Sequence, residues 1–207
     1  MYIPPAFAES DRAKLVEFIA QHSFGLLVSR LDGQLFATHL PLLFDAQVAA
    51  GGQLLGHMAR ANPQWQDLSG QQILAVFSGP HAYISPRWYE SDHVVPTWNY
   101  LAVHVVGTAE VIDNRETTAC IIEQYVSTYE RPPAAGSAWT IDLSEPFMQN
   151  MLTMVVGFRI HIERIEGKWK LGQNHTSERR SNVVQHLSAS DDPQSREIAR
   201  LMDQTMI

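Results

Sequence analysis

The sequence predicts an α+β protein built on an antiparallel β-barrel, with peripheral helices and a helical extension at the C-terminal end. Three observations indicate this class. Runs rich in β-branched and aromatic residues fill the centre, an Asp-Gly pair separates two early apolar runs, and helical spacing of apolar residues is confined to short segments. The runs amount to about seven strands, with helices inserted between and after them rather than alternating as in a parallel α/β sheet.

The first predicted element is a helix near the N-terminus, and a hairpin follows it at once. Ser10 or Asp11 can cap the helix, and its apolar residues recur at helical spacing until His22-Ser23 closes it. The runs FGLLVSR and QLFATHLPLLF then flank Asp32-Gly33. Asp-Gly between two apolar runs is typical of a two-residue hairpin turn, so we expect the helix to lie on this apolar pair of strands.

The centre of the chain is predicted to be mostly strand. The prediction rests on four runs, QLLGHMA, QILAVFSG, HAYISPRWY and TWNYLAVHVVGTAEVI, with Gly79-Pro80 and Ser85-Pro86 among the breaks. Between the first and second runs, Asn62 can act as the N-cap of a short helical turn. Pro63 then takes the first helical position, which tolerates a missing N–H.

A second helix is predicted from about Asn114 to Tyr129, because apolar residues again recur at helical spacing there. Cys120 lies inside this helix, and we expect a buried, inert thiol because no neighbouring motif supplies a base. Another short helix is expected from about Glu145 to Leu152.

The end of the chain is predicted to form one more hairpin and two helices. VVGFRIHIERIEGKWKLG alternates apolar and polar residues, which predicts two strands that turn at Glu166-Gly167. Residues 177–207 are polar and helix-prone, with a break at Asp191-Asp192-Pro193. We expect residues 1–175 to form the barrel domain and residues 176–207 to form a helical extension packed on it.

The composition indicates a folded protein with an acidic surface. The chain has 207 residues, 45% of them hydrophobic, which excludes disordered and fibrous classes. Acidic side chains number 22 against 15 basic ones, for a net charge of −7, and the lysines are confined to Lys14, Lys168 and Lys170. A large non-specific DNA-binding face is therefore not expected.

The cysteine content, the N-terminal segment and the length of the apolar runs indicate where the protein is located. A single cysteine cannot form an internal disulfide, and the N-terminal MYIPPAFAESDRAK has acidic residues but no apolar core of a secretory signal. Apolar runs fall well short of the about 18 residues of a membrane span. We expect a soluble cytoplasmic protein that does not enter membranes.

Several common catalytic motifs are missing from the sequence. The nine histidines form no His-Glu-x-x-His motif, and Cys-x-x-Cys is absent, so a metal site is not predicted. The sequence also lacks the Gly-x-Ser-x-Gly turn of hydrolases and the glycine-rich phosphate loops of nucleotide-binding proteins.

The segment GHMARANP has the composition of a phosphate site. Arg60 follows a predicted strand and directly precedes a helix start, and His57 lies on the same strand. Helix N–H groups, an arginine fork and an imidazole together can bind a phosphate. The alternative stays open that Asn62 only caps, that Arg60 is solvated, and that His57 is a hydrogen-bonded core residue.

Aromatic residues gather in a second stretch. Tyr83, Trp88, Tyr89, Trp98 and Tyr100 fall within residues 83–100. Such a density is typical of a core or an interface, but it would equally suit a planar ligand with a phosphate tail. In ATHLPLLF, a proline interrupts strand pairing and leaves neighbouring backbone groups free to bond a heterocycle.

Taken together, these segments resemble the PaiB family of FMN-binding negative transcriptional regulators. The resemblance spans residues 1 to 174 and rests on MYIPPAF, ATHLPLLF, LLGHMARANPQW, AVFSGPHAYISPRWY, VPTWNYLAVHVVGTAEVI and MVVGFRIHIERIEGKWKLGQN. It implies the FMN-binding split barrel as the fold, that is, an antiparallel split β-barrel. It also implies a homodimer with flavin sites at the subunit interface.

The resemblance further implies which residues bind FMN. The isoalloxazine ring would contact one strand, the ribityl-phosphate end would lie at the next strand and helix start, and aromatic residues would line the face shared between subunits. The residues concerned are Thr38, His39, Leu40 and Pro41 for the ring, His57, Met58, Ala59, Arg60 and Asn62 for the phosphate, Tyr83, Trp88, Trp98, Asn99 and Tyr100 for the shared face, and Lys170 and Gln173 in the C-terminal segment.

Two departures from the related pattern are visible. Relatives that oxidise pyridoxamine phosphate have Arg-Lys where this chain has Ala61-Asn62, so its phosphate site is less basic. The family commonly has Lys-Leu-Ser-Gln-Asn where this chain has KLGQN, and the glycine removes a hydroxyl and adds backbone freedom.

The function that the resemblance implies is repression of transcription. DNA contact would then depend on Arg179, Arg180, Arg196 and Arg200 of the C-terminal helices, although no helix-turn-helix signature is present. Two alternatives stay open: an FMN-dependent oxidoreductase for a small substrate, and a haem-binding or haem-degrading protein with His175 as an axial ligand.

Overall fold

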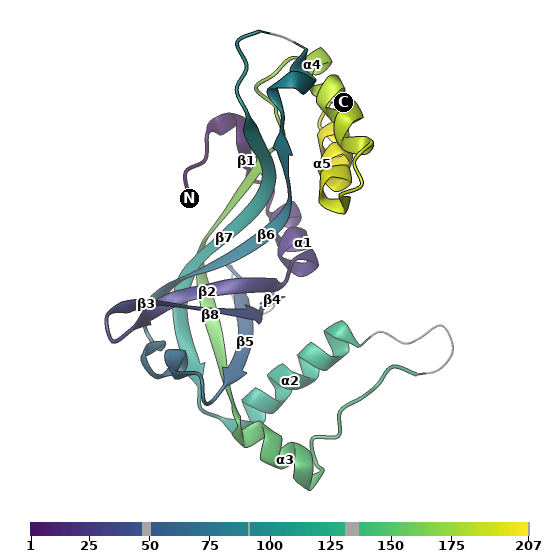
Figure 1. Ribbon diagram of the computed structural model, residues 1–207. Coiled ribbons are helices and arrows are strands. Elements are labelled where there is room, and N and C mark those ends of the chain that lie inside the picture. Colours follow the sequence, from purple (N-terminus) through teal and green to yellow (C-terminus); the bar gives the residue numbers. More distant parts are fainter. Residues whose placement is uncertain (47–50, 91, 131–136, 207) are drawn as a thin grey trace. The chain divides into compact units, whose positions relative to one another are not determined.

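The computed structural model describes residues 1–46, 51–90, 92–130 and 137–206, and Figure 1 shows how its elements follow one another. The elements in chain order are η1 Pro5–Phe7, β1 Ala8–Glu9, α1 Arg12–Gln21, β2 Phe24–Leu31, β3 Gln34–Pro41, β4 Leu43–Asp45, β5 Gln53–Ala59, η2 Pro63–Asp67, β6 Gln72–Ile84, η3 Pro86–Tyr89, β7 Thr97–Ile112, α2 Arg115–Tyr129, α3 Pro146–Thr153, β8 Val155–Lys170, α4 Ser177–Ser188 and α5 Pro193–Gln204. Within these residues, no helix has both the length and the apolar character needed to cross a membrane.

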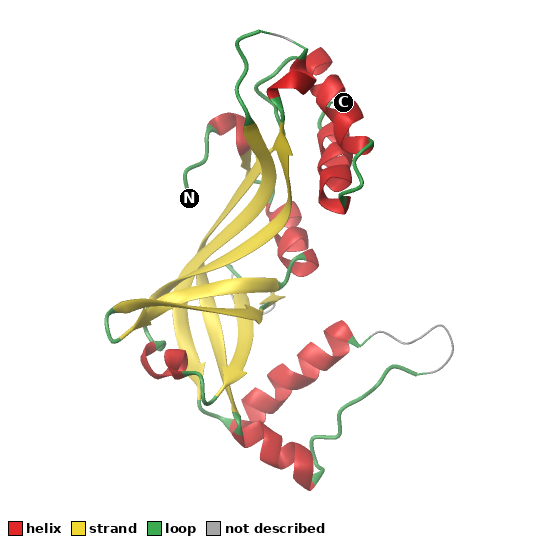
Figure 2. Cartoon of the chain, viewed as in Figure 1, coloured by secondary structure: helices red, strands yellow, loops and turns green. Residues whose placement is uncertain are grey.

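The strands form one sheet in the order β3-β2-β6-β7-β8-β5-β4, and β1 pairs with β8 (Figure 2). The pairs β1–β8, β2–β3, β2–β6, β4–β5 and β5–β8 are all antiparallel. For the described strands the order ends at β3 and β4, so the sheet is open rather than closed into a complete barrel. The predicted α+β class with an antiparallel sheet and peripheral helices is confirmed.

The chain divides into two compact units, whose boundaries fall inside α1, β6, β7 and β8. Unit 1 comprises Met1–Phe18, Phe77–His104 and Glu166–Ile207, and unit 2 comprises Ile19–Val76 and Val105–Ile165. The predicted division into a barrel at 1–175 and an extension at 176–207 does not coincide with these units and stays a prediction.

Unit 2 contains the predicted hairpin in the predicted register. Leu31 pairs with Gln34 across the turn, where Asp32 has φ 51° and Gly33 has φ 75°. Two successive positive φ angles define the tight turn whose twist matches the flanking strands, and Asp-Gly adopts it at little cost. In the same unit, the predicted helix at about Asn114 to Tyr129 is α2, and the Asn114 side chain caps it by accepting the Thr117 N–H.

Unit 1 contains the helix pair at the C-terminal end. Thr176 caps α4 by accepting the Arg179 N–H, and Asp192 caps α5 by accepting the N–H groups of Gln194 and Ser195. Both helices turn apolar residues inward, namely Val183 and Leu187 from α4 and Ile198, Ala199 and Met202 from α5. The predicted break at Asp191-Asp192-Pro193 is confirmed.

Two central runs that were expected to be separate strands form one. β6 continues from Gln72 to Ile84 through Gly79-Pro80, and the PRWY segment is the 3₁₀ helix η3 instead of strand. Proline lacks an N–H, so it is tolerated in a strand only where that N–H is not needed. The β2–β6 register covers Leu74–Val76, and Pro80 lies beyond it.

The predicted final hairpin is wrong, because β8 is a single strand from Val155 to Lys170. Gly167 does not turn the chain. A Cβ atom at this position would lie 2.2 Å from Leu15 Cδ2 and 3.1 Å from the Glu9 carbonyl oxygen, so the glycine permits close packing beside β1. Close approach of another backbone is the second common reason for a glycine in a strand.

The expected burial of Cys120 is also wrong, since its thiol is exposed. The buried residues of α2 are Thr118, Ile121 and Tyr125, which recur at helical spacing. Cys120 precedes Ile121 by one residue and therefore points about 100° away from that buried stripe.

Candidate functional site

In unit 2, the end of β3 and the start of η2 are joined through the predicted residues Thr38 and Asn62. The Asn62 Nδ2 donates to Thr38 Oγ1 at 2.9 Å, and Asn62 Oδ1 accepts the Gln64 N–H at 3.0 Å. Pro63 has no N–H to offer. The first N–H groups of this short helix are therefore either absent or already bonded, and a phosphate here would depend on side chains.

The other predicted residues of β3 differ in exposure. Leu40 is buried, whereas the His39 side chain is exposed and its ring stacks with Phe24 at 6.2 Å. Pro41 ends the strand, and its carbonyl oxygen lies 2.6 Å from the Tyr125 hydroxyl. The proline is thus an anchoring point for α2.

Tyr125 itself was predicted only as part of an apolar helix face. Its hydroxyl lies within hydrogen-bond distance of two backbone carbonyls, Pro41 O at 2.6 Å and Leu55 O at 2.9 Å. Burial raises the pKa of this phenol, so it remains a neutral donor. Its position among apolar neighbours, where a phenol must find a partner, is the signal that could have revealed this role.

His57 on β5 packs against the ring of Tyr125. The two ring centroids are 4.8 Å apart at an interplanar angle of 85°. Within the described residues, His57 Nδ1 is buried without a hydrogen-bond partner, and burial lowers the pKa of the imidazole. A neutral ring with a buried, unused nitrogen is suited to bond a ligand.

Arg60 follows β5 and is held by backbone carbonyls near the end of α3. Its Nε donates to Thr153 O at 2.9 Å, a terminal nitrogen donates to Val155 O at 3.2 Å, and its guanidinium lies 5.6 Å from the Trp65 ring centroid. Of its neighbours, Ala59 is exposed and Met58 is a core side chain. The described bonds leave the other terminal nitrogen, Nη1, available.

In unit 1, the predicted aromatic residues Tyr83 and Trp98 meet at the surface. Their ring centroids are 5.9 Å apart at 69°, and His81 lies 6.0 Å from Trp98. Lys170 Nζ donates to Trp98 O at 2.8 Å and also to Thr97 Oγ1. Burial and, secondarily, Lys168 lower the pKa of Lys170. These residues form one exposed aromatic surface with a lysine at its edge.

The remaining predicted residues of unit 1 are engaged in other contacts. Asn99 is 1% exposed, and its Nδ2 donates to Met202 Sδ at 3.3 Å. Trp88 stacks on His186 of α4 at 5.5 Å, and Lys168 Nζ lies 5.1 Å from the Tyr100 ring centroid. The structure does not bring Asn99 to the side of the strand that carries Trp98 and Tyr100.

Gln173 has both ends of its amide bonded locally. Its Oε1 accepts the Leu171 N–H at 2.8 Å, and its Nε2 donates to Trp169 O at 2.6 Å. This residue therefore shapes the turn after β8. Nearby, the ring of His175 packs on Tyr89 at 4.6 Å, and burial is the main reason that the pKa of His175 is lowered.

The expected arginine patch on the C-terminal helices is smaller than predicted. Arg180 is only 7% exposed, and it donates to Met202 O at 3.0 Å, to Thr205 O at 3.1 Å and to Thr205 Oγ1. It stabilises the C-terminal end of α5 and is not available to DNA, so its inclusion in the patch was wrong. Arg196 and Arg200 are exposed, and Arg200 pairs with Glu197 at 2.5 Å.

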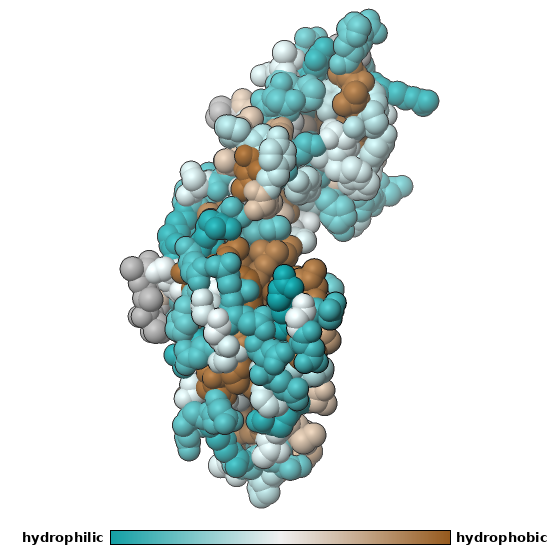
Figure 3. Space-filling model, turned by 90° about the vertical axis from the view of Figure 1, so that its left-hand side faces the viewer, coloured by the Kyte–Doolittle hydropathy of each residue, from teal (hydrophilic) through white to brown (hydrophobic). Residues whose placement is uncertain are grey.

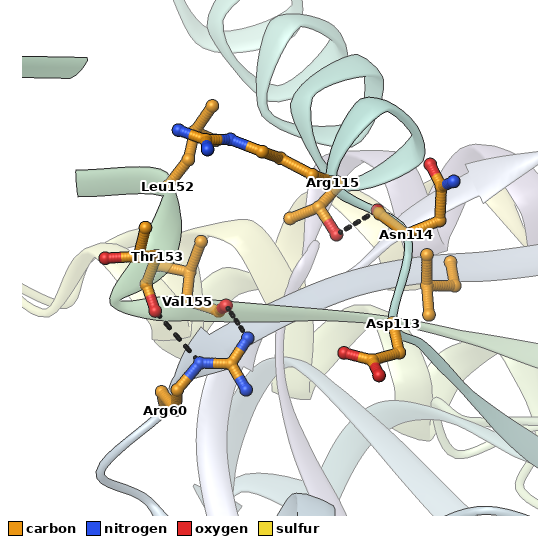
Figure 4. A pocket seen from close by; sticks show the side chains of 9 residues that line it. Arg60, Asp113, Asn114, Arg115, Leu152, Thr153 and Val155 are labelled. Atoms are coloured by element: carbon orange, nitrogen blue, oxygen red, sulfur yellow. Dashed lines mark hydrogen bonds between the residues drawn. The ribbon is translucent and has the colours of Figure 1, made fainter. Parts of the chain in front are cut away.

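Unit 2 also contains a pocket of about 260 Å³ beside Arg60 (Figure 4). Ile112, Asp113, Asn114, Arg115, Thr118, Leu152, Thr153 and Val155 complete its lining. Arg115 lies in this pocket although nothing in its sequence context singled it out. Among the described residues, no group of three histidine, cysteine, aspartate or glutamate side chains could hold a metal ion.

The open antiparallel sheet with peripheral helices is the split barrel of flavin-binding proteins. Two solved structures share the fold of this chain. The flavocytochrome Anf3 from Azotobacter vinelandii has a TM-score of 0.60 at 16% identity and covers 84% of this chain and 75% of its own. The FAD and haem binding protein from Mycobacterium smegmatis has a TM-score of 0.56 at 15% identity, with 84% and 78% covered.

The chain belongs to the family described as "Putative FMN-binding domain", whose model matches residues 1–164. FMN is the cofactor that this membership assigns. A relative, the protease synthase and sporulation protein PAI 2 of Bacillus subtilis, is 35% identical over 98% of this chain and 97% of its own length. An uncharacterised protein of Emericella nidulans is 26% identical, with 89% of each chain covered.

Proposed function

We propose that the protein binds FMN on its split barrel and acts as a PaiB-type negative regulator of transcription. The single observation that carries the proposal is the end-to-end similarity to PAI 2, at 35% identity over 98% of the chain, within an FMN-binding family. When bound, FMN supplies redox chemistry, while the protein binds and orients its planar ring.

Some residues of the proposed FMN site offer unused or exposed groups. His57 Nδ1 is buried and unpartnered, and Nη1 of Arg60 is left by its carbonyl bonds, so both fit a ligand with polar and anionic groups. Trp98 and Tyr83 offer exposed rings to an isoalloxazine. The full proposed set is Thr38, His39, Leu40, Pro41, His57, Met58, Ala59, Arg60, Asn62, Tyr83, Trp88, Trp98, Asn99, Tyr100, Lys170 and Gln173.

The proposed assembly is a homodimer in the cytoplasm, with flavin at the subunit interface. Large apolar side chains at the surface support an interface: Phe24 and Leu35 in unit 2, and Tyr83, Val95 and Trp98 in unit 1, are all exposed. Figure 3 shows apolar residues that reach the surface in separate patches on one face. Burial of such residues against a second copy is a common reason for their exposure in a single chain.

FMN titration of two variants, each with one tryptophan replaced, tests the proposed contact with the flavin ring. Trp98 and Trp139 are 52% and 53% exposed, but only Trp98 belongs to the proposed site. Loss of an aromatic contact costs about 0.5–1.5 kcal/mol. Trp98→Ala is therefore expected to weaken FMN binding by up to about tenfold, as measured by flavin fluorescence, whereas Trp139→Ala binds as the parent does. Equal affinities of both variants would contradict the ring assignment.

A further inference from the structure

The pocket beside Arg60 in unit 2 has a buried, largely apolar floor and a charged rim. Ile112, Thr118 and Leu152 are buried and form the floor. Arg60, Arg115 and Asp113 are exposed at the rim, and Figure 4 shows Arg60 and Arg115 entering from different elements. Its volume of about 260 Å³ is just below the about 300–1,000 Å³ of typical small-molecule sites. The pocket is therefore suited to a compact ligand.

Both arginines are held in place by backbone carbonyls of α3 and the residues that follow it. Arg60 donates to Thr153 O at 2.9 Å and to Val155 O at 3.2 Å, and Arg115 donates to Gln149 O at 2.6 Å. These bonds fix the two guanidinium groups while leaving Nη1 of each without a described bond. Planar guanidinium groups fixed in this way bind carboxylates and phosphates with little further loss of side-chain entropy.

The charges at the rim favour an anion. The rim carries two guanidinium groups, those of Arg60 and Arg115, and one carboxylate, that of Asp113. The 15-residue helix α2 begins at Arg115, so the positive end of its dipole adds to the same potential. Asp113 lies opposite Arg60 (Figure 4), where it can accept a hydrogen bond from a hydroxyl or ammonium group of the same ligand.

We propose that this pocket binds an oxyanion, a phosphate or carboxylate group, between Arg60 and Arg115. Two sources can supply the group. One is the phosphate of bound FMN, which rests on the proposed function, and the other is a free small organic acid, which does not. In both cases Arg115 is a binding residue that the phosphate-site motif around Arg60 does not contain.

Calorimetric titrations with inorganic phosphate, FMN and riboflavin test the proposal and separate the two sources. Arg115→Gln is the test variant. Arg30→Gln is its matched control, because Arg30 is also an exposed arginine of unit 2 with one carbonyl bond, to Gly33 O at 3.0 Å. We expect Arg115→Gln to weaken binding of an anionic probe at least tenfold and Arg30→Gln to leave it unchanged. Arg115→Lys, which keeps the charge but loses the fork, is expected to fall between them.

The pattern across the three probes identifies the anion. A loss for FMN without a loss for riboflavin assigns the pocket to the flavin phosphate. A loss for inorganic phosphate alone assigns it to a free acid, and this result stands even if no flavin binds, so failure of the proposed function is recognised separately. Unchanged affinity of Arg115→Gln for both FMN and inorganic phosphate, in a variant whose melting temperature and circular dichroism match the parent, overturns the proposal.

Discussion

Tyr125 is the residue on which unit 2 depends for the join between α2 and the sheet. The Tyr125 hydroxyl lies within hydrogen-bond distance of the carbonyl of Pro41, at the end of β3, and of the carbonyl of Leu55, within β5. The Tyr125 ring also packs against the ring of His57. A buried phenol that can donate to either of two strand carbonyls holds α2 against the sheet in a way that an apolar ring could not. Two residues of the proposed flavin site, Pro41 and His57, are therefore positioned by the same side chain.

Removal of this hydroxyl is expected to destabilise the protein. Tyr125→Phe removes the single hydroxyl proton that lies within reach of both Pro41 O and Leu55 O, and loss of this largely buried bond is expected to cost about 1–3 kcal/mol in the free energy of unfolding. Urea denaturation measures the change. Tyr129→Phe is the matched control, because it removes an exposed bond to Ser23 of 2.7 Å and should cost well under about 1 kcal/mol. Equal losses for the two variants would contradict the role of Tyr125.

The buried imidazole of His57 predicts a loss of stability in acid. Burial lowers the pKa of His57, and burial is also the first cause of the lowered pKa of His104 and of His175. Such groups bind fewer protons folded than unfolded, so their contribution to stability is complete above the unfolded pKa of about 6.5 and is lost as the pH falls below it.

The contribution of His57 can be isolated with one variant. His57→Phe keeps a ring against Tyr125 but cannot take up a proton. The melting temperature of the parent is expected to fall between pH 7.5 and pH 5.5, and that of His57→Phe should fall less over the same interval. Parallel curves for the two proteins would show that His57 is not the group responsible.

For single residues, a helix cap could be predicted from the sequence, but hydrogen bonds to residues far along the chain could not. Asn62 and Pro63 were identified as a helix start from residue type alone, and the structure confirms the cap. The bonds of Arg60 could not be predicted, because its acceptors, Thr153 O and Val155 O, lie more than ninety residues away in the chain. Burial of Arg180 against Thr205 likewise depends on how α4 packs on α5.

At the scale of elements, β8 shows why local patterns can mislead. Alternation of apolar and polar residues continues on both sides of Glu166-Gly167, and such a pair between two runs usually marks a turn. Here β1 pairs with this part of β8, Ala8 with Lys168 and Glu9 with Gly167. The strand continues because it gains a partner far away in sequence, which a reading of neighbouring residues cannot detect. The α-helices, whose caps and apolar faces are local, were predicted to within a few residues.

The packing at Gly167 can be tested by adding one methyl group. The new Cβ atom would lie 2.2 Å from Leu15 Cδ2 and 2.9 Å from Trp169 Cζ3. Overpacking of this kind costs about 1–3 kcal/mol, and we expect Gly167→Ala to lower the free energy of unfolding by that amount. If the clash with Leu15 is the cause, the double variant Leu15→Ala and Gly167→Ala is less destabilised than the sum of the single ones. Strict additivity would contradict this explanation.

At the scale of the whole molecule, the net charge of −7 limits how the protein can meet DNA. Of the four arginines expected to contact DNA, Arg196 and Arg200 are the exposed ones; Arg196 donates to Ser190 O at 2.7 Å, and Arg200 is paired with Glu197. So few phosphate contacts support only a weak, salt-sensitive interaction by charge alone. A repressor of this kind would need specific base contacts or two copies acting together.

A gel-shift series in increasing salt tests this limit. Each phosphate contact contributes about 0.9 to the slope of log affinity against log salt. With a mixed pool of duplex fragments at low salt, Arg196→Gln is expected to reduce the slope by about that amount, whereas Arg30→Gln leaves it unchanged. If both variants retain the slope of the parent, the C-terminal helices are not the DNA-binding surface.

Equilibrium dialysis of the purified protein against FMN measures whether the split barrel binds this cofactor. We expect saturable binding of one FMN for each chain, together with release of free FMN when the protein is unfolded. Dialysis that leaves FMN equally distributed across the membrane at every concentration, with a correctly folded protein, would contradict it.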